Sequence, residues 1–130
     1  MRAAIALVWT VVLLAASSAM ATQDQSLMTA ALTQAPGRSL EALRVRYAPG
    51  ESSRPHQHDR DAYVYVLEGR VRSQVEGQPV RTYATGENWF EPAGARHLVS
   101  ANASASEPAT ILVVFVGQAR IQPGSRTQSR

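Results

Sequence analysis

Most of the chain alternates apolar and polar residues with a period of two. Residues 62–67 run Ala-Tyr-Val-Tyr-Val-Leu, and further on Val71, Ser73 and Val75 alternate with arginine and glutamine. Such alternation is typical of strands, because successive side chains of a strand point to opposite faces of the sheet. Residues 109–116 are almost wholly apolar, which suits a strand buried on both faces.

Shorter strand patterns fill the rest of this region and are separated by turns. They lie at residues 39–47, 80–83, 88–90 and 96–101. Glycine and proline mark the connections, as in the tight turn Pro92-Ala93-Gly94. Many short strands at such spacing predict an all-β sandwich or barrel, and the length of the chain allows one domain.

The segment before residue 39 has a different pattern, and so has the end of the chain. Between residues 25 and 34 the apolar side chains follow helical spacing, and Pro36-Gly37 ends the run. We therefore expect a short helix or arm over residues 22–38, followed by the β-barrel over residues 39–117. Residues 118–130 hold little that could be buried, so we expect them to be a disordered tail.

The first 21 residues have the three parts of a secretory signal peptide. Met1-Arg2 is a short positive start, residues 3–16 are apolar except for Thr10, and Ala19-Met20-Ala21 is a small-residue cleavage site. The alternative is an uncleaved membrane anchor, but the apolar run is shorter than the roughly 18 to 20 residues that a span needs. We expect cleavage, no membrane association afterwards, and a periplasmic or secreted protein.

Charge and cysteine content exclude several classes of function. All 13 basic residues are arginines, against 10 acidic residues, and they are scattered rather than clustered with aromatic residues. A nucleic-acid partner is therefore not expected. The chain has no cysteine, which excludes a lipid-anchored lipoprotein, disulfides and a catalytic thiol. Without a Gly-x-Ser-x-Gly motif either, covalent catalysis has no visible basis, and we identify no catalytic residue.

The three histidines of the chain have the spacing of one metal site. His56 and His58 stand at i and i+2, so on a strand both imidazoles point to the same face, and a neighbouring strand can supply His97. Three such ligands suit one divalent metal ion (Fe, Zn, Cu, Ni or Mn) and leave open positions for water or a substrate. The alternative is three unrelated, solvated histidines.

The histidines also lie in two motifs that resemble those of the cupin superfamily. The first motif consists of Gly50, His56, His58 and Gly69, and the second motif consists of Gly86, Pro92, Gly94 and His97. The resemblance covers residues 50–102 and, with the flanking strands, roughly 39–117. It implies a single-domain cupin β-barrel, also called a jelly roll or double-stranded β-helix, which holds one metal and one small-molecule ligand and commonly dimerises.

Two departures from the cupin pattern affect the site. Ala62 stands where the pattern has a metal-binding glutamate, and the last asparagine of the pattern is displaced by one position, from Ala101 to Asn102. The shell is then three histidines at best, as in some cupin dioxygenases, completed by water or substrate. A Tyr63 ligand would require a β-bulge. Glu91 is the nearest candidate for a site acid, although a solvated turn residue is its simpler interpretation.

The barrel interior predicts a small-molecule site. We expect Ala62, Val64, Val66, Val99 and part of residues 111–115 to line an apolar cavity. A metal held by neutral histidines keeps its full charge and favours anionic ligands. The leading hypothesis is therefore an exported metalloenzyme with oxygenase-like or isomerase-like activity on a small anionic molecule. The alternatives are a non-catalytic binding or sensing module and a purely structural metal.

One row of side chains is expected on the outside of the barrel. Tyr63, Tyr65 and Leu67 alternate with the interior residues of the same strand. An apolar row of this kind is covered either by the arm around residues 27–32 or by a second subunit. Together with the resemblance to cupins, this row predicts a homodimer.

Overall fold

The structure is a computed structural model that describes residues 22–120, and its regular elements are strands. These are β1 (Gln23–Ala31), β2 (Arg38–Tyr47), β3 (Ser52–Ser53), β4 (His56–Gln57), β5 (Asp61–Glu68), β6 (Arg70–Val75), β7 (Arg81–Ala84), β8 (Asn88–Glu91), β9 (Arg96–Asn102) and β10 (Ala109–Gln118). The prediction of an all-β fold is confirmed. Within residues 22–120 no helix has the length and apolarity to cross a membrane. The predicted signal peptide, and the predicted tail from residue 121 on, lie outside the described residues.

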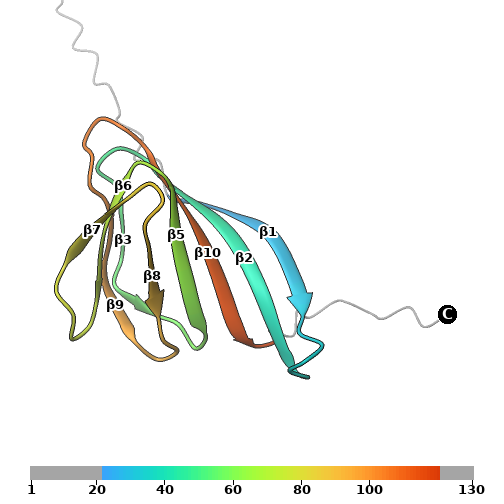
Figure 1. Ribbon diagram of the computed structural model, residues 1–130. Coiled ribbons are helices and arrows are strands. Elements are labelled where there is room, and N and C mark those ends of the chain that lie inside the picture. Colours follow the sequence, from blue (N-terminus) through green and yellow to red (C-terminus); the bar gives the residue numbers. More distant parts are fainter. Residues whose placement is uncertain (1–21, 121–130) are drawn as a thin grey trace, which may run out of the picture.

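The strands form two antiparallel sheets that face each other (Figure 1). Sheet I has the order β1-β2-β10-β5-β8, and sheet II has the order β3-β9-β6-β7, with the short β4 paired to β9. Two stacked sheets place alternate residues of every strand between them. The most deeply buried large side chains are Val64, Val66 and Val71, so the core contains residues from both sheets. This is the jelly-roll barrel that the resemblance to cupins implies, and it agrees with the sandwich or barrel that the pattern of short strands predicts.

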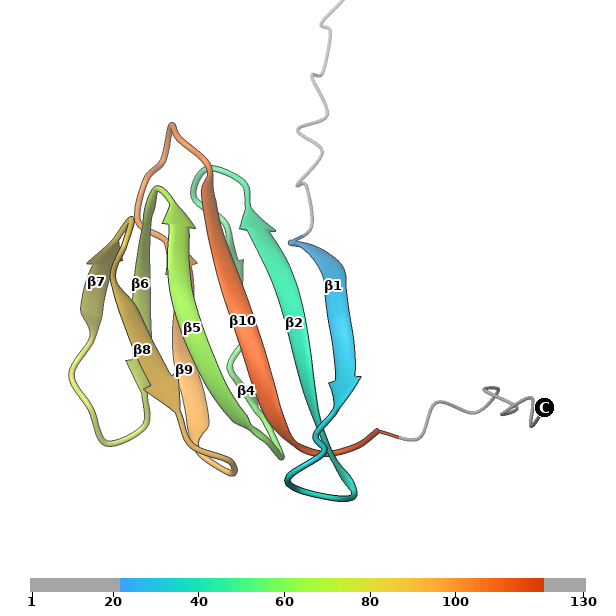
Figure 2. The same ribbon diagram turned by 45° about the vertical axis from the view of Figure 1, so that its right-hand side comes forward.

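The expected N-terminal helix is wrong, because residues 23–31 form strand β1. This strand pairs with β2 from Gln23 to Ala31 and forms the outer edge of sheet I, as Figure 2 shows. A β-bulge between Ser26 and Met28 inserts one residue, which produces the i, i+1 apolar pair that resembles helical spacing. Leu27 and Met28 are 48% and 52% exposed, so a helix would have had little apolar surface to bury there.

A second β-bulge changes which residue of β9 lines the cavity, so the predicted lining is wrong at one position. The register between β6 and β9 shifts at Leu98, so that His97 and Ser100 face inward although they are three residues apart. Val99, which we expected to line the cavity, is only half-buried, and Ser100 lines the cavity in its place. The same extra residue turns Asn102 inward, where its amide donates to two backbone carbonyls. The displaced asparagine of the motif is thus explained by the bulge.

The outer face of sheet I is apolar over its central strands. Tyr63 is paired directly with Phe90 of β8 and with Val114 of β10, and paired residues in antiparallel strands point to the same face. Tyr63, Leu67 and Phe90 are 42%, 43% and 55% exposed. The arm does not cover them, because β2 and β10 separate β1 from β5. The prediction that the arm covers this row is therefore wrong, and the prediction that a second subunit covers it stays a prediction.

We expect the protein to form a homodimer through this outer face in solution. Contiguous exposed apolar patches often mark interfaces between subunits. A two-fold axis would place this patch of one subunit against the same patch of the other subunit. Static light scattering at tens of micromolar should give twice the monomer mass, and Tyr63→Asp should shift the population to monomer. Val80→Asp is the matched control, since Val80 is 51% exposed outside both sheets. A wild-type monomer would contradict this prediction.

Candidate functional site

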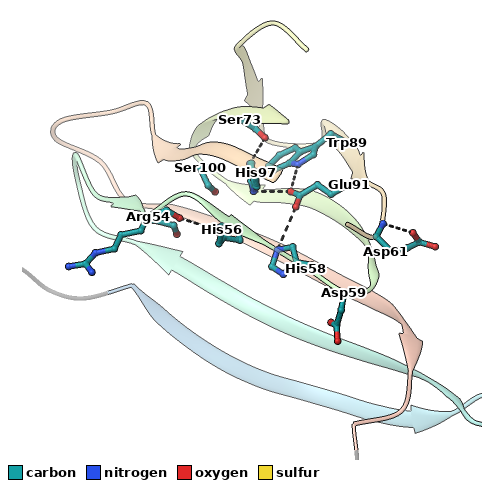
Figure 3. Close-up of polar contacts among 12 residues, drawn as sticks. Arg54, His56, His58, Asp59, Asp61, Ser73, Trp89, Glu91, His97 and Ser100 are labelled. Atoms are coloured by element: carbon teal, nitrogen blue, oxygen red, sulfur yellow. Dashed lines mark hydrogen bonds and ion pairs between the residues drawn. The ribbon is translucent and has the colours of Figure 1, made fainter. Parts of the chain in front are cut away.

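The three histidines meet at one end of the space between the sheets. His56 of β4 is the direct strand partner of His97 in β9, and His58 follows two residues after His56. The ring of His56 lies 4.7 Å from that of His58 and 5.1 Å from that of His97, measured between ring centres. Figure 3 shows the three imidazoles directed toward a common volume. The predicted convergence is present, although the metal itself stays a prediction.

Glu91 joins this cluster, which corrects its interpretation as a solvated turn residue. It is the last residue of β8 and only 4% exposed. Its Oε1 lies 3.2 Å from Nδ1 of His97 and accepts a hydrogen bond from Trp89 Nε1 at 2.8 Å. Its Oε2 lies 3.6 Å from Nε2 of His58. In Figure 3 the carboxylate of Glu91 stands between the two histidines.

Glu91 lies directly opposite the position where the cupin motif has its metal-binding glutamate. Strands β5 and β8 are antiparallel neighbours, and the Cα partner of Glu91 is Ala62. Partners of this kind carry their Cβ atoms about 5 Å apart on the same face of the sheet. The small Ala62 is fully buried and leaves space for the carboxylate from the opposite strand. An acidic group thus reaches the interior from β8 instead of β5.

Hydrogen bonds fix which ring nitrogens face the centre of the cluster. The backbone carbonyl of Arg54 accepts a hydrogen bond from Nδ1 of His56 at 2.7 Å, which leaves Nε2 as the ring nitrogen that can bind a ligand. In His97 the arrangement is reversed: Nε2 is bonded to the Ser73 hydroxyl at 2.9 Å, and Nδ1 faces Glu91. Partners of this kind orient histidines in metal sites.

Burial controls the charge of the cluster. It is the main reason why the pKa values of His58 and His97 fall to about 4, and the positive charge that His56 can carry contributes further. Burial also raises the pKa of Glu91 above its ordinary value, while the hydrogen bond from Trp89 opposes this rise. At neutral pH both histidines are therefore neutral, which is the form that binds metals.

The metal-free protein should lose stability as the pH falls from 6.5 toward 4. In this range an unfolded chain protonates the two histidines, but the folded protein keeps them neutral, so acid favours unfolding. At pH 5 each imidazole should contribute a loss of up to about 2 kcal/mol. The raised pKa of Glu91 acts in the opposite direction and offsets part of this loss.

Urea unfolding of chelator-treated protein at pH 7 and pH 5 measures this effect. The midpoint should fall at the lower pH, and the fall should shrink in a variant with both His58→Gln and His97→Gln. An equal fall in that variant would assign the acid sensitivity to other groups.

The cluster opens into a cavity of about 230 Å³ between the sheets. Its apolar wall includes Val64, as the sequence predicts, together with Ile111, Val113 and Phe115. Ala62 and Val66 are fully buried but belong to the core behind this wall. Leu43 and Val45 of β2 complete the apolar lining. The cavity therefore combines the histidine cluster with an apolar wall, and a few other polar side chains, among them Glu41 and Arg60, also line it, which is the usual form of a small-molecule site.

Tyr63 faces outward as predicted, but another tyrosine, Tyr47, reaches the cavity. Tyr63 is 42% exposed on the outer face, and no bulge turns it inward. Tyr47 of β2 is 3% exposed and lines the cavity, with its hydroxyl 2.8 Å from Ser100 and 3.1 Å from Ser53. Burial raises the pKa of Tyr47, so it stays protonated at neutral pH and can donate a hydrogen bond. Its inward position follows from the period of β2.

The donor atoms lie at distances that a metal site can use, although they do not yet enclose a metal. Among residues 22–120 no group of three or more histidine, cysteine or acidic side chains is arranged to hold an ion as it stands. However, two ligands that each lie about 2.1 Å from a metal are roughly 3.0 to 3.4 Å apart. The 3.2 Å between His97 and Glu91 falls in this range, and the 3.6 Å between His58 and Glu91 is slightly wider. The nitrogens of His97 and His58 that face Glu91 therefore lie near enough to its carboxylate for these three residues to share an ion.

Comparison with known proteins agrees with this architecture. A family model described as a cupin domain matches residues 43–115. Among solved structures, the chain is similar to TT1209 from Thermus thermophilus, with 32% identity over 72% of this chain and 81% of that one, and a TM-score of 0.58. No curated protein is significantly similar to this chain.

Two similar solved structures are enzymes by name. The DMSP lyase DddQ from Ruegeria pomeroyi DSS-3 is 26% identical over 64% of this chain and 41% of that one, with a TM-score of 0.56. An oxalate oxidase in complex with the substrate analogue glycolate is 25% identical over 58% of this chain and 41% of that one, with a TM-score of 0.54. This chain therefore spans about two fifths of the length of either enzyme.

Proposed function

This chain belongs to the cupin family, and from that premise we propose that it binds one divalent metal ion through His56, His58, His97 and Glu91. The bound metal would act on a small anionic molecule in the adjoining cavity. The observation that carries the proposal is the convergence of these four side chains, from β4, the loop after it, β8 and β9, beside the apolar wall of one cavity.

Glu91 supports this proposal because its position answers the main departure from the family pattern. The glutamate that the cupin motif has on β5 is absent, and its directly paired neighbour on β8 provides a carboxylate at the same depth. With this carboxylate, three neutral imidazoles and one negative charge surround the metal. The net charge of a divalent site would then be +1, which still favours an anionic ligand.

The residues around the cluster would position the ligands and exclude water. The Arg54 carbonyl and the Ser73 hydroxyl hold His56 and His97 in their orientations, and Trp89 holds Glu91. The apolar wall keeps the dielectric low, which strengthens the interaction between a bound ion and an anion. Tyr47 can donate its phenolic proton to a polar atom of the ligand from the side of β2. When bound, the metal would supply a Lewis acid and open coordination positions.

For the activity itself we propose oxygenase-like or isomerase-like conversion. Two of the similar solved structures are enzymes, and one of them holds glycolate, a small carboxylate. The alternative is a binding or sensing module without turnover. Tight binding of a ligand that is recovered unchanged at full metal loading would support the alternative.

Isothermal titration calorimetry with Mn(II), Fe(II), Zn(II), Cu(II) and Ni(II) tests the metal proposal. We expect at least one of these ions to bind with a stoichiometry of one per chain. Failure of every ion to bind would contradict the proposal. We also propose that the protein is exported. Mass spectrometry of the N-terminus of protein purified from its native compartment tests this proposal, and the expected result is cleavage after Ala21.

A further inference from the structure

Arg60 is a buried cation that the proposed metal site does not use. It lies in the loop between β4 and β5 and is 3% exposed. A charge in this environment must be compensated, because removing it from water costs several kcal/mol. Nη1 of Arg60 pairs with Glu41 Oε2 at 2.8 Å. Nε, in contrast, is shielded from solvent and has no hydrogen-bond partner among residues 22–120.

The nearest acidic group does not satisfy this Nε atom. Oδ1 of Asp59 lies 3.9 Å away, which is too far for a hydrogen bond. The same oxygen lies 3.4 Å from Nη2 of Arg120. Buried donors in folded proteins are nearly always paired, so this donor, on a residue that lines the cavity, needs a partner that a bound ligand would supply.

The surrounding strands hold the guanidinium in a fixed position. Its Cζ lies 4.7 Å from the ring centre of Phe115, within the range of a cation–π contact. At Gly117 a Cβ atom would lie 2.9 Å from Arg60 Cβ and 3.1 Å from Arg60 Cδ, so any side chain there would displace the arginine. Glycine inside a strand often marks such a close approach. Arg60 is therefore positioned before any ligand binds.

Arg60 and the metal cluster line the same cavity. Phe115 connects them, because its ring lies 4.7 Å from the ring of His58 and carries the guanidinium of Arg60. The volume of 230 Å³ corresponds to about eight water-sized groups. A molecule of that size could contact both the histidine cluster and Arg60, with its apolar part against Phe115 and Val113.

We propose that Arg60 is a carboxylate anchor and that the ligand is a small monocarboxylate. Glu41 occupies Nη1, which leaves the edge formed by Nε and Nη2 for the two oxygens of a carboxylate. A guanidinium edge matches a carboxylate in a bidentate pair, which a neutral amide of the same shape cannot form. The ligand's identity as a substrate rests on the proposed function, but the anchor itself does not need a metal.

The test compares butanoate with butanamide in NMR titrations of metal-free protein at pH 7.5. Wild type should bind butanoate at least tenfold more tightly than butanamide, and Arg60→Met should lose this preference. Arg72→Met is the matched control, because Arg72 is an exposed arginine on β6 that does not line the cavity, and it should keep the preference. Gly117→Ala should weaken the preference without removing any charge, and it replaces Arg60→Met as the test if that variant does not fold.

Two results would overturn the anchor. They are equal binding of butanoate and butanamide by wild type, and a preference that Arg60→Met or Gly117→Ala keeps in full. These results leave the metal proposal intact, because metal binding is measured separately. A protein that prefers butanoate but binds no metal would contradict the proposed function and support the anchor.

Discussion

Replacing His97 by alanine is expected to abolish metal binding, with a loss of affinity of more than about 100-fold. The imidazole lies at the centre of the cluster, between Glu91 and the ring of His56. Changes in residues that only orient a ligand already cost 10-fold to 100-fold in affinity, so removing a ligand should cost more. Calorimetry with the ion that wild type binds most tightly measures the loss.

The neighbouring residue provides the control for His97→Ala. Arg96 lies on the same strand, β9, but its side chain is exposed. Arg96→Ala should therefore bind metal as wild type does. If His97→Ala kept wild-type affinity while folded, the three histidines would not form the metal site.

Glu91→Gln should weaken metal binding by about 10-fold to 100-fold. The amide keeps the volume of Glu91 and can still accept the hydrogen bond from Trp89, but it loses the negative charge beside His58 and His97. Glu76→Gln removes a charge at an exposed position and should leave the affinity unchanged. Equal affinity in Glu91→Gln and wild type would show that Glu91 is not a ligand.

The pairing of β5 with β8 allows a stricter test of the same carboxylate. The double variant Ala62→Glu with Glu91→Ala exchanges two directly paired residues and conserves the total volume. We expect the double variant to recover most of the affinity that Glu91→Ala alone loses, because the carboxylate returns to the same face of sheet I. No recovery in a folded double variant would mean that the cavity accepts the carboxylate only from β8.

Local patterns in the sequence predicted most of the barrel, because alternation reports which face of a strand is buried. Val64, Val66 and Val71 are buried as predicted. The pattern fails where a bulge inserts a residue. At Leu98 it turns Ser100 inward instead of Val99, and near Leu27 it imitates helical spacing. A bulge depends on the partner strand, so its position is not visible in one strand alone.

The candidate site was predictable only in part for a similar reason. His56 and His58 share a face by their spacing, and the resemblance to cupins placed His97 with them. Glu91 reaches the cluster because β8 pairs with β5, a relation that one sequence does not display. The position of Arg60 depends on Phe115 and Gly117, which lie more than fifty residues later in the chain. Long-range pairing thus decides that the candidate acid Glu91 reaches the site, and it places the basic group, Arg60, that local patterns missed.

The most direct test of the central claim is elemental analysis of the protein purified from its native compartment without chelator, beside His56→Ala. His56 directs its free Nε2 toward the cluster, so its removal should release the ion. The account predicts about one equivalent of a single transition metal in wild type and almost none in His56→Ala. No metal in wild type, or equal amounts in both proteins, would contradict it.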